Sequence, residues 1–266
     1  MDQYIESNIY VDNIRDKLLY YPFSGNDFKV PISLFMDIVD EFWFVDISYF
    51  RTHNRPSVDN RIIPELNFIS SKFVGPKLAE IEYSCRSSRP YDYLEPGYIE
   101  EIYSFSTRKI RIMFRRGYDY TSLFGPSRLE IAQDRLGIFF FRGISSEGGS
   151  NHSWMSDKPV YMIRGEPKVR LIHMLLNALP DGGLIVTDAS LGYFQDKHIK
   201  KSHEYYPLHE FFSNRDVSCQ EAYERAKPFE DSFGRSFRCV GYAGMKNGPT
   251  LIWQVRKKFI NEKRKY

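Results

Sequence analysis

The sequence has few cysteines, no long apolar run and no large excess of charge of either sign. Its three cysteines, Cys85, Cys219 and Cys239, are far apart and odd in number, so they predict neither a disulfide framework nor a metal site. No stretch approaches a run of about 18 apolar residues, the length of a membrane-spanning helix. The N-terminal segment MDQYIESNIYVDNIRDK contains acidic residues and lacks the apolar region of a secretory signal. These absences predict a cytoplasmic protein with no metal ligands and no membrane segment.

The charges are nearly balanced, with 37 basic and 34 acidic residues and a net charge of +3. Bulk charge therefore gives no indication of nucleic-acid binding. Two tracts, RKIRIMFRRG (108–117) and KHIKKSHEYY (197–206), nevertheless interleave basic and aromatic residues, which suits phosphate contact and base stacking. Such tracts are more often solvated surfaces, so a small molecule and a nucleic acid both stay open as partners.

Hydrophobic residues make up 42% of the 266-residue chain, which is enough for a sizeable core. Apolar residues run continuously, as in strands buried on both faces of a parallel sheet, at 17–23, 42–48, 135–143 and 184–190. Helices are predicted from the spacing of apolar residues or from local pattern at 30–42, 167–179 and 218–228. The segment 237–257 reads as two strands joined by a tight turn at Lys246-Asn247-Gly248-Pro249.

This alternation of strands and helices predicts an α/β fold. We expect a mainly parallel sheet flanked by helices, with a C-terminal antiparallel hairpin and an antiparallel elaboration in 65–130. No repeat or low-complexity linker divides the chain. A single domain over 1–266 is therefore predicted, with an irregular insertion at about 51–135.

The segment YYPFSGND (20–27) places Gly25 in a turn between a predicted strand and a predicted helix. A glycine at this point lets the backbone approach a ligand closely, and the helix start offers free N–H groups. Asp46 ends the next strand, FWFVDIS (42–48), 21 residues after Gly25, close to the spacing of about 20 in dinucleotide-binding units. Such a carboxylate can accept hydrogen bonds from a ribose diol, or else cap a loop. Asp27 is either a further ligand contact or the helix N-cap.

The loop FRGISSEGGSNHSW (141–154) follows a buried strand, where α/β proteins bind their ligands. It contains a cation, a carboxylate and a titratable ring in Arg142, Glu147 and His152. Glu147 or His152 could act as general base toward a hydroxyl or amine acceptor. A flexible polar connection would have the same composition. Asp188 ends another predicted strand and could face the same site or cap the strand.

The order of four segments resembles the class I S-adenosylmethionine-dependent methyltransferases, which have a Rossmann-like fold. The segments are YYPFSGND, FWFVDIS, HMLLNALPDGGLIVTD (173–188) and FRCVGYAGMKNGPTLIWQV (237–255). The resemblance implies that Gly25 faces the methionine part of S-adenosylmethionine and Asp46 its ribose. The cofactor-binding set is then Ser24, Gly25, Asp27, Asp46 and Ile47. The set near the acceptor is Arg142, Glu147 and His152.

Two other functions stay open. The turn has one glycine where the family has several, and Phe23 is bulky, which favours a relative that has lost catalysis and acts as a binding or assembly subunit. The loop around Glu147 would also suit another nucleotide-dependent transferase. No phosphate-binding P-loop, zinc cluster or nucleophile elbow is present to indicate a kinase, a zinc hydrolase or a serine hydrolase.

Overall fold

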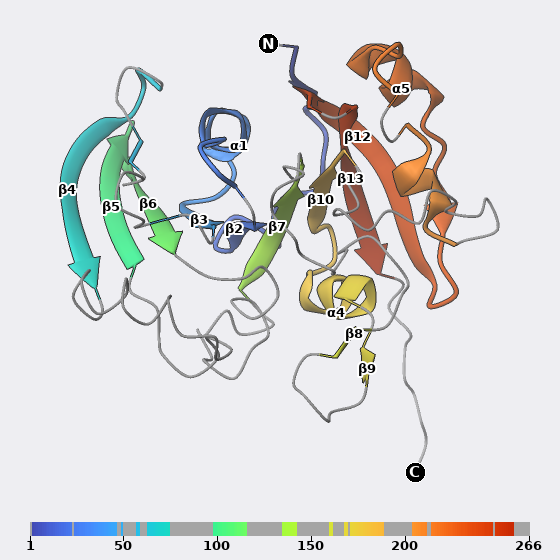
Figure 1. Cartoon of the computed structure of the whole chain (residues 1–266), viewed down its shortest axis with the longest axis horizontal. Coiled ribbons are helices and arrows are strands. Elements are labelled where there is room, and N and C mark those ends of the chain that lie inside the picture. Colours follow the sequence, from blue (N-terminus) through green and yellow to red (C-terminus); the bar gives the residue numbers. More distant parts are fainter. Residues whose placement is uncertain are drawn as a thin grey trace.

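A computed structural model gives the arrangement of the chain (Figure 1). The described residues are 2–22, 24–46, 49, 57–58, 63–74, 98–115, 135–142, 160–161, 168–169, 171–188, 204–211, 214–246 and 248–257. The strands of the main sheet are β1 (Tyr4–Ile5), β2 (Leu18–Pro22), β3 (Glu41–Val45), β4 (Asn67–Val74), β5 (Tyr98–Phe105), β6 (Arg108–Arg115), β7 (Leu136–Phe141), β10 (Leu184–Thr187), β11 (Phe229–Glu230), β12 (Arg235–Met245) and β13 (Pro249–Lys257). The described helices are α1 (Lys29–Phe35), α4 (Leu171–Ala178), α5 (Cys219–Arg225) and the 3-10 helix η1 (Tyr206–His209). β8 (Val160–Tyr161) and β9 (Lys168–Val169) form a separate antiparallel pair.

The main sheet has the strand order β1-β12-β13-β10-β7-β2-β3-β6-β5-β4, with β11 paired to β12. Neighbours from β10 to β6 in this order pair in parallel. All other described pairings of the sheet are antiparallel, at its two ends. The sheet therefore has a parallel centre of five strands between two antiparallel flanks.

The predicted fold class, a mainly parallel sheet flanked by helices, is wrong. The sheet is mixed and largely antiparallel, and the three described α-helices have only seven or eight residues each. One reason lies in the segment 65–130, which is expected as an antiparallel elaboration within an irregular insertion. It contributes the eight-residue strands β4 and β5 to the main sheet, beside β6, and so extends the antiparallel share.

The central strands are buried on both faces, which explains their continuous apolar sequences. Every residue of β2, β7 and β10 is buried. Alternate side chains enter two different cores, so that Tyr20 lies in one cluster and Leu19 and Tyr21 lie in the other. Burial on both sides requires an element over each face, and short helices provide part of this cover.

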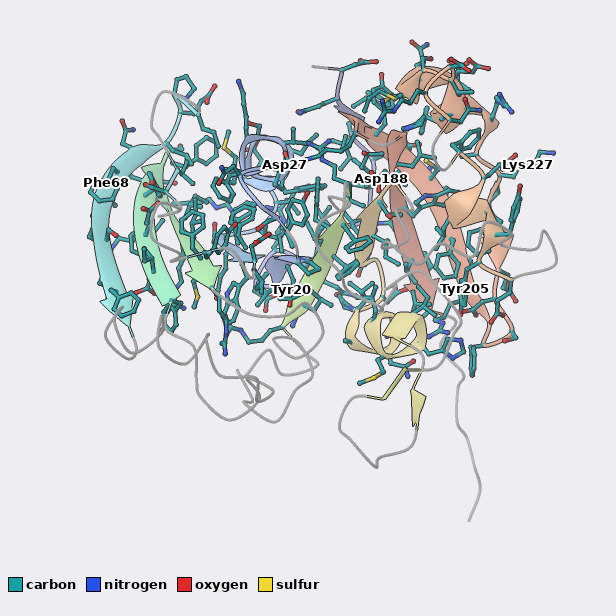
Figure 2. The ribbon with its side chains drawn as sticks, viewed as in Figure 1. Tyr20, Asp27, Phe68, Asp188, Tyr205 and Lys227 are labelled. Atoms are coloured by element: carbon teal, nitrogen blue, oxygen red, sulfur yellow. The ribbon has the colours of Figure 1, made fainter. Side chains whose placement is uncertain are left out.

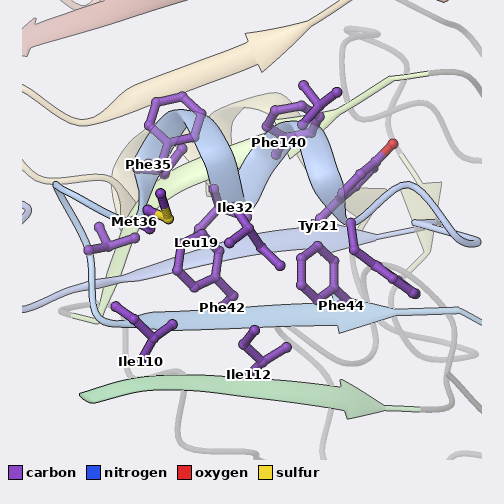
Figure 3. Packing of buried hydrophobic residues seen from close by; sticks show 14 of the residues in the cluster. Leu19, Tyr21, Ile32, Phe35, Met36, Phe42, Phe44, Ile110, Ile112 and Phe140 are labelled. Atoms are coloured by element: carbon purple, nitrogen blue, oxygen red, sulfur yellow. The ribbon is translucent and has the colours of Figure 1, made fainter. Parts of the chain in front are cut away.

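The helix α1 covers one face of the sheet, and α4 and α5 contribute to the core on the other face. Val30, Ile32 and Phe35 of α1 belong to the same cluster as the rings of β2 and β3 on that face (Figure 3). The opposite cluster contains side chains of α4 and α5, namely Ile172, Leu175, Leu176, Cys219 and Ala222. The amphipathic faces of these short helices are thus stabilised by packing on the sheet.

The hairpin of β12 and β13 forms one end of the sheet, and β1 adds to its outer side. Tyr4 and Ile5 pair with Tyr242 and Gly241 of β12. A Cβ atom at Gly241 would lie 2.2 Å from the carbonyl oxygen of Tyr4. Glycine is therefore required where the N-terminal strand crosses the hairpin.

Candidate functional site

Polar groups follow four neighbouring parallel strands at the edge where these strands end. The turn 24–27 follows β2, Asp46 follows β3, Arg142 follows β7 and Asp188 follows β10. We call this edge of the sheet, with the residues 24–27, Asp46, Arg142 and Asp188, the carboxyl edge. Figure 2 labels Asp27 and Asp188, which both lie along this edge. The parallel pairings of β3, β2, β7 and β10 bring these strand ends to one edge of the sheet.

The strand order reverses within the carboxyl edge. From β2 the chain continues to β3 and β6 on one side, and it later returns to β7 and β10 on the other side. The two connections leave in opposite directions, so the reversal lies between β2 and β7. Sheets with parallel strands bind ligands beyond the carboxyl ends of the strands at such a reversal. The turn 24–27 and Arg142 follow the two strands that flank it.

The glycine turn and the strand-end carboxylate contact each other directly. The backbone N–H of Gly25 donates to Oδ2 of Asp46 over 3.0 Å. Gly25 has a φ of +52°, a value that favours glycine, and the N–H of Asp27 donates to the carbonyl oxygen of Ser24 over 3.0 Å to close the turn. Asp46 itself is only half-buried. The spacing of 21 residues therefore brings together the two groups that sequence reasoning selected.

Tyr49, which sequence reasoning missed, holds the turn from inside the protein. Its hydroxyl donates to the carbonyl oxygen of Gly25 over 2.7 Å and lies 2.6 Å from Oγ of Ser24. Burial raises the pKa of Tyr49 well above its usual value, so the hydroxyl stays protonated and can donate. Ser24 is buried as well. Its hydroxyl is thus engaged within the turn.

Asp27 and Arg142 form a two-armed ion pair across the edge. Nε of Arg142 donates to Oδ2 of Asp27 over 2.7 Å, and Nη2 donates to Oδ1 over 2.8 Å. The guanidinium also donates to the carbonyl oxygen of Ala243 over 2.6 Å. The hydroxyl of Tyr21 donates to the same carboxylate over 2.9 Å. This group joins the turn after β2 to the ends of β7 and β12.

The electrostatics of the pair keep both partners charged. Burial alone would raise the pKa of Asp27, but the hydrogen bonds and charge of Arg142 outweigh it and lower this pKa below its usual value. Burial would lower the pKa of Arg142, yet Asp27 raises it. Asp27 does not cap α1, because the N-cap residue is Phe28 and has no side-chain cap bond. Its carboxylate binds Arg142 instead.

The remaining predicted residues fall into two groups. Asp188 is buried at the end of β10. The pKa of Tyr21 is raised mainly by burial and by the charge of Asp27, and the charge of Asp188 raises it further. Ile47, Glu147 and His152 lie outside the described residues. The catalytic roles of Glu147, His152 and Arg142 therefore stay predictions, and Arg142 is the only one of the three whose contacts the structure describes.

The basic tract 108–117 is used largely in internal ion pairs. Arg108 pairs with Asp40, and Arg111 pairs with Glu100 and Glu41. Arg115 is buried in the sheet. This part of the tract consequently offers few free charges to a nucleic acid. Most of the second tract, 197–206, lies outside the described residues.

The described residues contain no group of three or more histidine, cysteine or acidic side chains that could hold a metal ion. Among the described helices, none combines the length and the apolar character needed to cross a bilayer. In comparisons with known proteins, no protein-family model, no curated protein and no solved structure matches the chain. The residues of the carboxyl edge are therefore the basis for a functional proposal.

Proposed function

We propose that the carboxyl edge binds S-adenosylmethionine and that the protein is a methyltransferase whose acceptor is undefined. The observation that carries the proposal is the hydrogen bond from the Gly25 amide to the Asp46 carboxylate. It joins a glycine turn and an acidic strand end beside the reversal of strand order, an arrangement suited to a ribose and its substituents. The resemblance of four sequence segments to class I methyltransferases points to the same ligand.

The residues of the turn fit such a ligand. A Cβ atom built on Gly25 would meet no heavy atom of the described residues within 4 Å, so none of these residues fills the space beside the turn. Asp46 lies next to this space through its bond to Gly25. A carboxylate has several acceptor positions and can bond both hydroxyls of a ribose. Asp46 would thus hold the ribose and Gly25 would lie beside the methionine part, while the bond from Tyr49 keeps the backbone of the turn in place.

A nucleoside fits this turn better than a phosphate does. Phosphate sites use backbone N–H groups that point at the anion. Here the Gly25 N–H already donates to a carboxylate, and a phosphate at that position would meet the negative charge of Asp46. The sulfonium and the hydroxyls of S-adenosylmethionine would meet an acceptor instead. This contact favours S-adenosylmethionine over the alternative of a phosphorylated cofactor.

In this proposal the bound cofactor supplies an electrophilic methyl group. Asp27 and Arg142 have a positioning role, since their ion pair holds the turn against β7 and β12. A general base would accept the proton of a hydroxyl or amine acceptor. Glu147 and His152 remain the candidates for that base.

A non-catalytic binding subunit is the second candidate function, and one contact favours it. The guanidinium of Arg142 is committed to Asp27 and to the carbonyl oxygen of Ala243. A group held in this way is suited to a structural role and is not available for a catalytic one. Such a subunit would bind the cofactor or its product without methylating any acceptor.

Calorimetric titration with S-adenosylmethionine and S-adenosylhomocysteine tests the proposal, after mass spectrometry has checked for copurified ligand. We expect micromolar binding by the wild-type protein. Asp46→Asn should weaken it by about 10- to 100-fold, because charged hydrogen bonds to the ribose are lost. Asp37→Asn is the matched control, since Asp37 is exposed beyond the other end of α1.

Two results would contradict the assignment. One is the absence of binding to either compound together with the absence of copurified ligand. The other is unchanged affinity in a folded Asp46→Asn variant. Binding without methyl transfer to protein, nucleic-acid or small-molecule acceptors would instead support the non-catalytic subunit.

A further inference from the structure

The strand β4 lies at the end of the described strand order and is exposed along almost its whole length. Residues 67–73 are each exposed. Three of them are large apolar residues: Phe68 at 49%, Ile69 at 50% and Phe73 at 36% exposure. Figures 1 and 2 show β4 as the outermost strand, with Phe68 labelled on it. A long apolar edge strand of this kind is a template for pairing with another strand.

A β-bulge gathers the two phenylalanines of β4 on one face. The register moves two residues along β4, from Phe68 to Ser70, while it moves one residue along β5. Ile69 is therefore the additional residue. Phe68 lies opposite Tyr103 and Phe73 lies opposite Ile99, and these two partners share one face of β5 because they are four residues apart. In a regular strand, positions 68 and 73 would point to opposite faces.

The charge of β4 is compensated within the subunit. Its single charged residue is Lys72, which lies opposite Glu100 and whose Nζ is 2.5 Å from Oε2 of that carboxylate. Because Glu100 and Ile99 are neighbours in β5, Lys72 lies on the face away from Phe73. Lysine on an edge strand usually discourages pairing. Here a salt bridge neutralises it, and β4 itself adds no charged residue to the face of Phe68 and Phe73.

We propose that β4 pairs with β4 of a second copy of this chain, antiparallel and about a two-fold axis at Ser71. In this register Lys72 lies opposite Ser70 of the second copy, so no like charges face each other. Phe73 reaches the bulge at Ile69 and the adjacent Phe68 of the second copy. The strand is therefore complementary to itself, as a two-fold interface requires. The two sheets join into one continuous sheet.

Because β4 is complementary to itself, a second copy of the chain is favoured over an unrelated extended peptide as the partner of this edge. An unrelated peptide would gain affinity from the main-chain hydrogen bonds of the edge and specificity from pockets for its alternate side chains, and it would not require β4 to match its own sequence. Two-fold pairing demands an uncharged residue at the axis and an uncharged partner for Lys72, and β4 meets both demands with Ser71 and Ser70. The edge strand is also separated by β5 and β6 from β3, which contributes to the carboxyl edge.

The oligomeric state of the full-length protein tests the interface. Analytical ultracentrifugation over a series of concentrations should show a species of twice the 31.4 kDa chain mass. Ile69→Asp places a charge at the bulge of both copies and should raise the dissociation constant about 100-fold. Phe233→Ser is the control, because Phe233 is exposed at 60% in the turn before β12, outside β4. It should leave the dimer unchanged.

Disulfide trapping tests the register independently of any destabilised variant. Cysteines at the axis of an antiparallel pair lie within reach of a disulfide. Under mild oxidation Ser71→Cys should form a covalent dimer, while Ser232→Cys, at an exposed position elsewhere, should stay uncross-linked. A wild-type protein that is monomeric at every concentration would overturn the proposal. So would a dimer that Ser71→Cys does not trap and that Ile69→Asp leaves intact.

Discussion

Breaking the ion pair of Asp27 and Arg142 should destabilise the protein strongly. The side chains are 13% and 4% exposed, so either partner alone would leave a largely buried charge. Removing one member of a buried pair costs about 3–5 kcal/mol of the free energy of unfolding. Arg142→Met should cost about 3 kcal/mol, the low end, because Nζ of Lys246 lies 3.9 Å from the carboxylate and compensates part of its charge. Asp27→Asn should cost about 4 kcal/mol, since it leaves the guanidinium without its carboxylate.

The double variant Asp27→Asn/Arg142→Met separates the interaction from the loss of either side chain. With both charges removed, no unpaired charge remains buried, so the double variant should be more stable than the sum of the single costs predicts. A coupling of about 2 kcal/mol or more is expected for groups in direct contact. Urea unfolding measures each free energy through the fluorescence of the buried residues Trp43 and Trp253.

Two results would refute this reasoning. Single costs below about 1 kcal/mol would place the pair among weak surface salt bridges. Costs that simply add in the double variant would show that the two side chains act independently. Equal slopes of free energy against urea concentration in all four proteins are the control, because they show that each unfolds to the same extent.

Two further predictions follow from perturbed pKa values. Arg142 lowers the folded-state pKa of Asp27, so the stability from this group is present above the unfolded value of about 3.9 and is lost as the pH falls through the folded value. Thermal unfolding between about pH 5 and 2 should therefore show a shallower acid loss for Asp27→Asn than for the wild type, and parallel curves would contradict this. Burial raises the pKa of Cys239 to about 12 and also raises that of Cys219. In a Cys85→Ser variant both thiols should react with Ellman's reagent only after unfolding, and rapid reaction of either in the native protein would argue against their burial.

The positions of the central strands were predictable because their burial leaves a local signal. Strands buried on both faces need continuous apolar sequence, and β2, β3, β7 and β10 begin or end within a few residues of the predicted limits. The helix predicted at 167–179 corresponds to α4 at Leu171–Ala178, and that at 218–228 to α5. The capping of α5 is local as well, since Oγ of Ser218 accepts from the N–H of Glu221.

The fold class was not predictable in the same way, because pairing direction depends on contacts between distant segments. An antiparallel elaboration is expected over 65–130, but local sequence does not show how many of its strands join the main sheet. The bulge at Ile69 also breaks the two-residue alternation of faces that a regular strand would have. The helix predicted over 30–42 instead ends as α1 at Phe35, and β3 begins at Glu41.

The candidate site shows the same division between local and distant contacts. The contact of Gly25 with Asp46 follows from a spacing that strand–turn–helix units share. The pairing of Asp27 with Arg142 spans 115 residues, and nothing in either local sequence indicates it. Tyr49 gives no signal either, since a tyrosine shortly after a strand has no typical role. Only the folded chain shows that its hydroxyl reaches the turn.

These contacts explain how a turn with one glycine keeps a fixed shape. Glycines in such turns supply positive φ values and let the backbone approach the ligand. Within residues 24–27 only Gly25 has a positive φ, and the side chains of Tyr49 and Asp46 fix its carbonyl and its amide. Ser24 and Asn26 can then be ordinary residues, because the turn needs no further conformational freedom. The number of glycines is thus a poor indicator of whether this turn keeps its shape. The hydrogen bonds of the Gly25 amide and carbonyl are a better indicator.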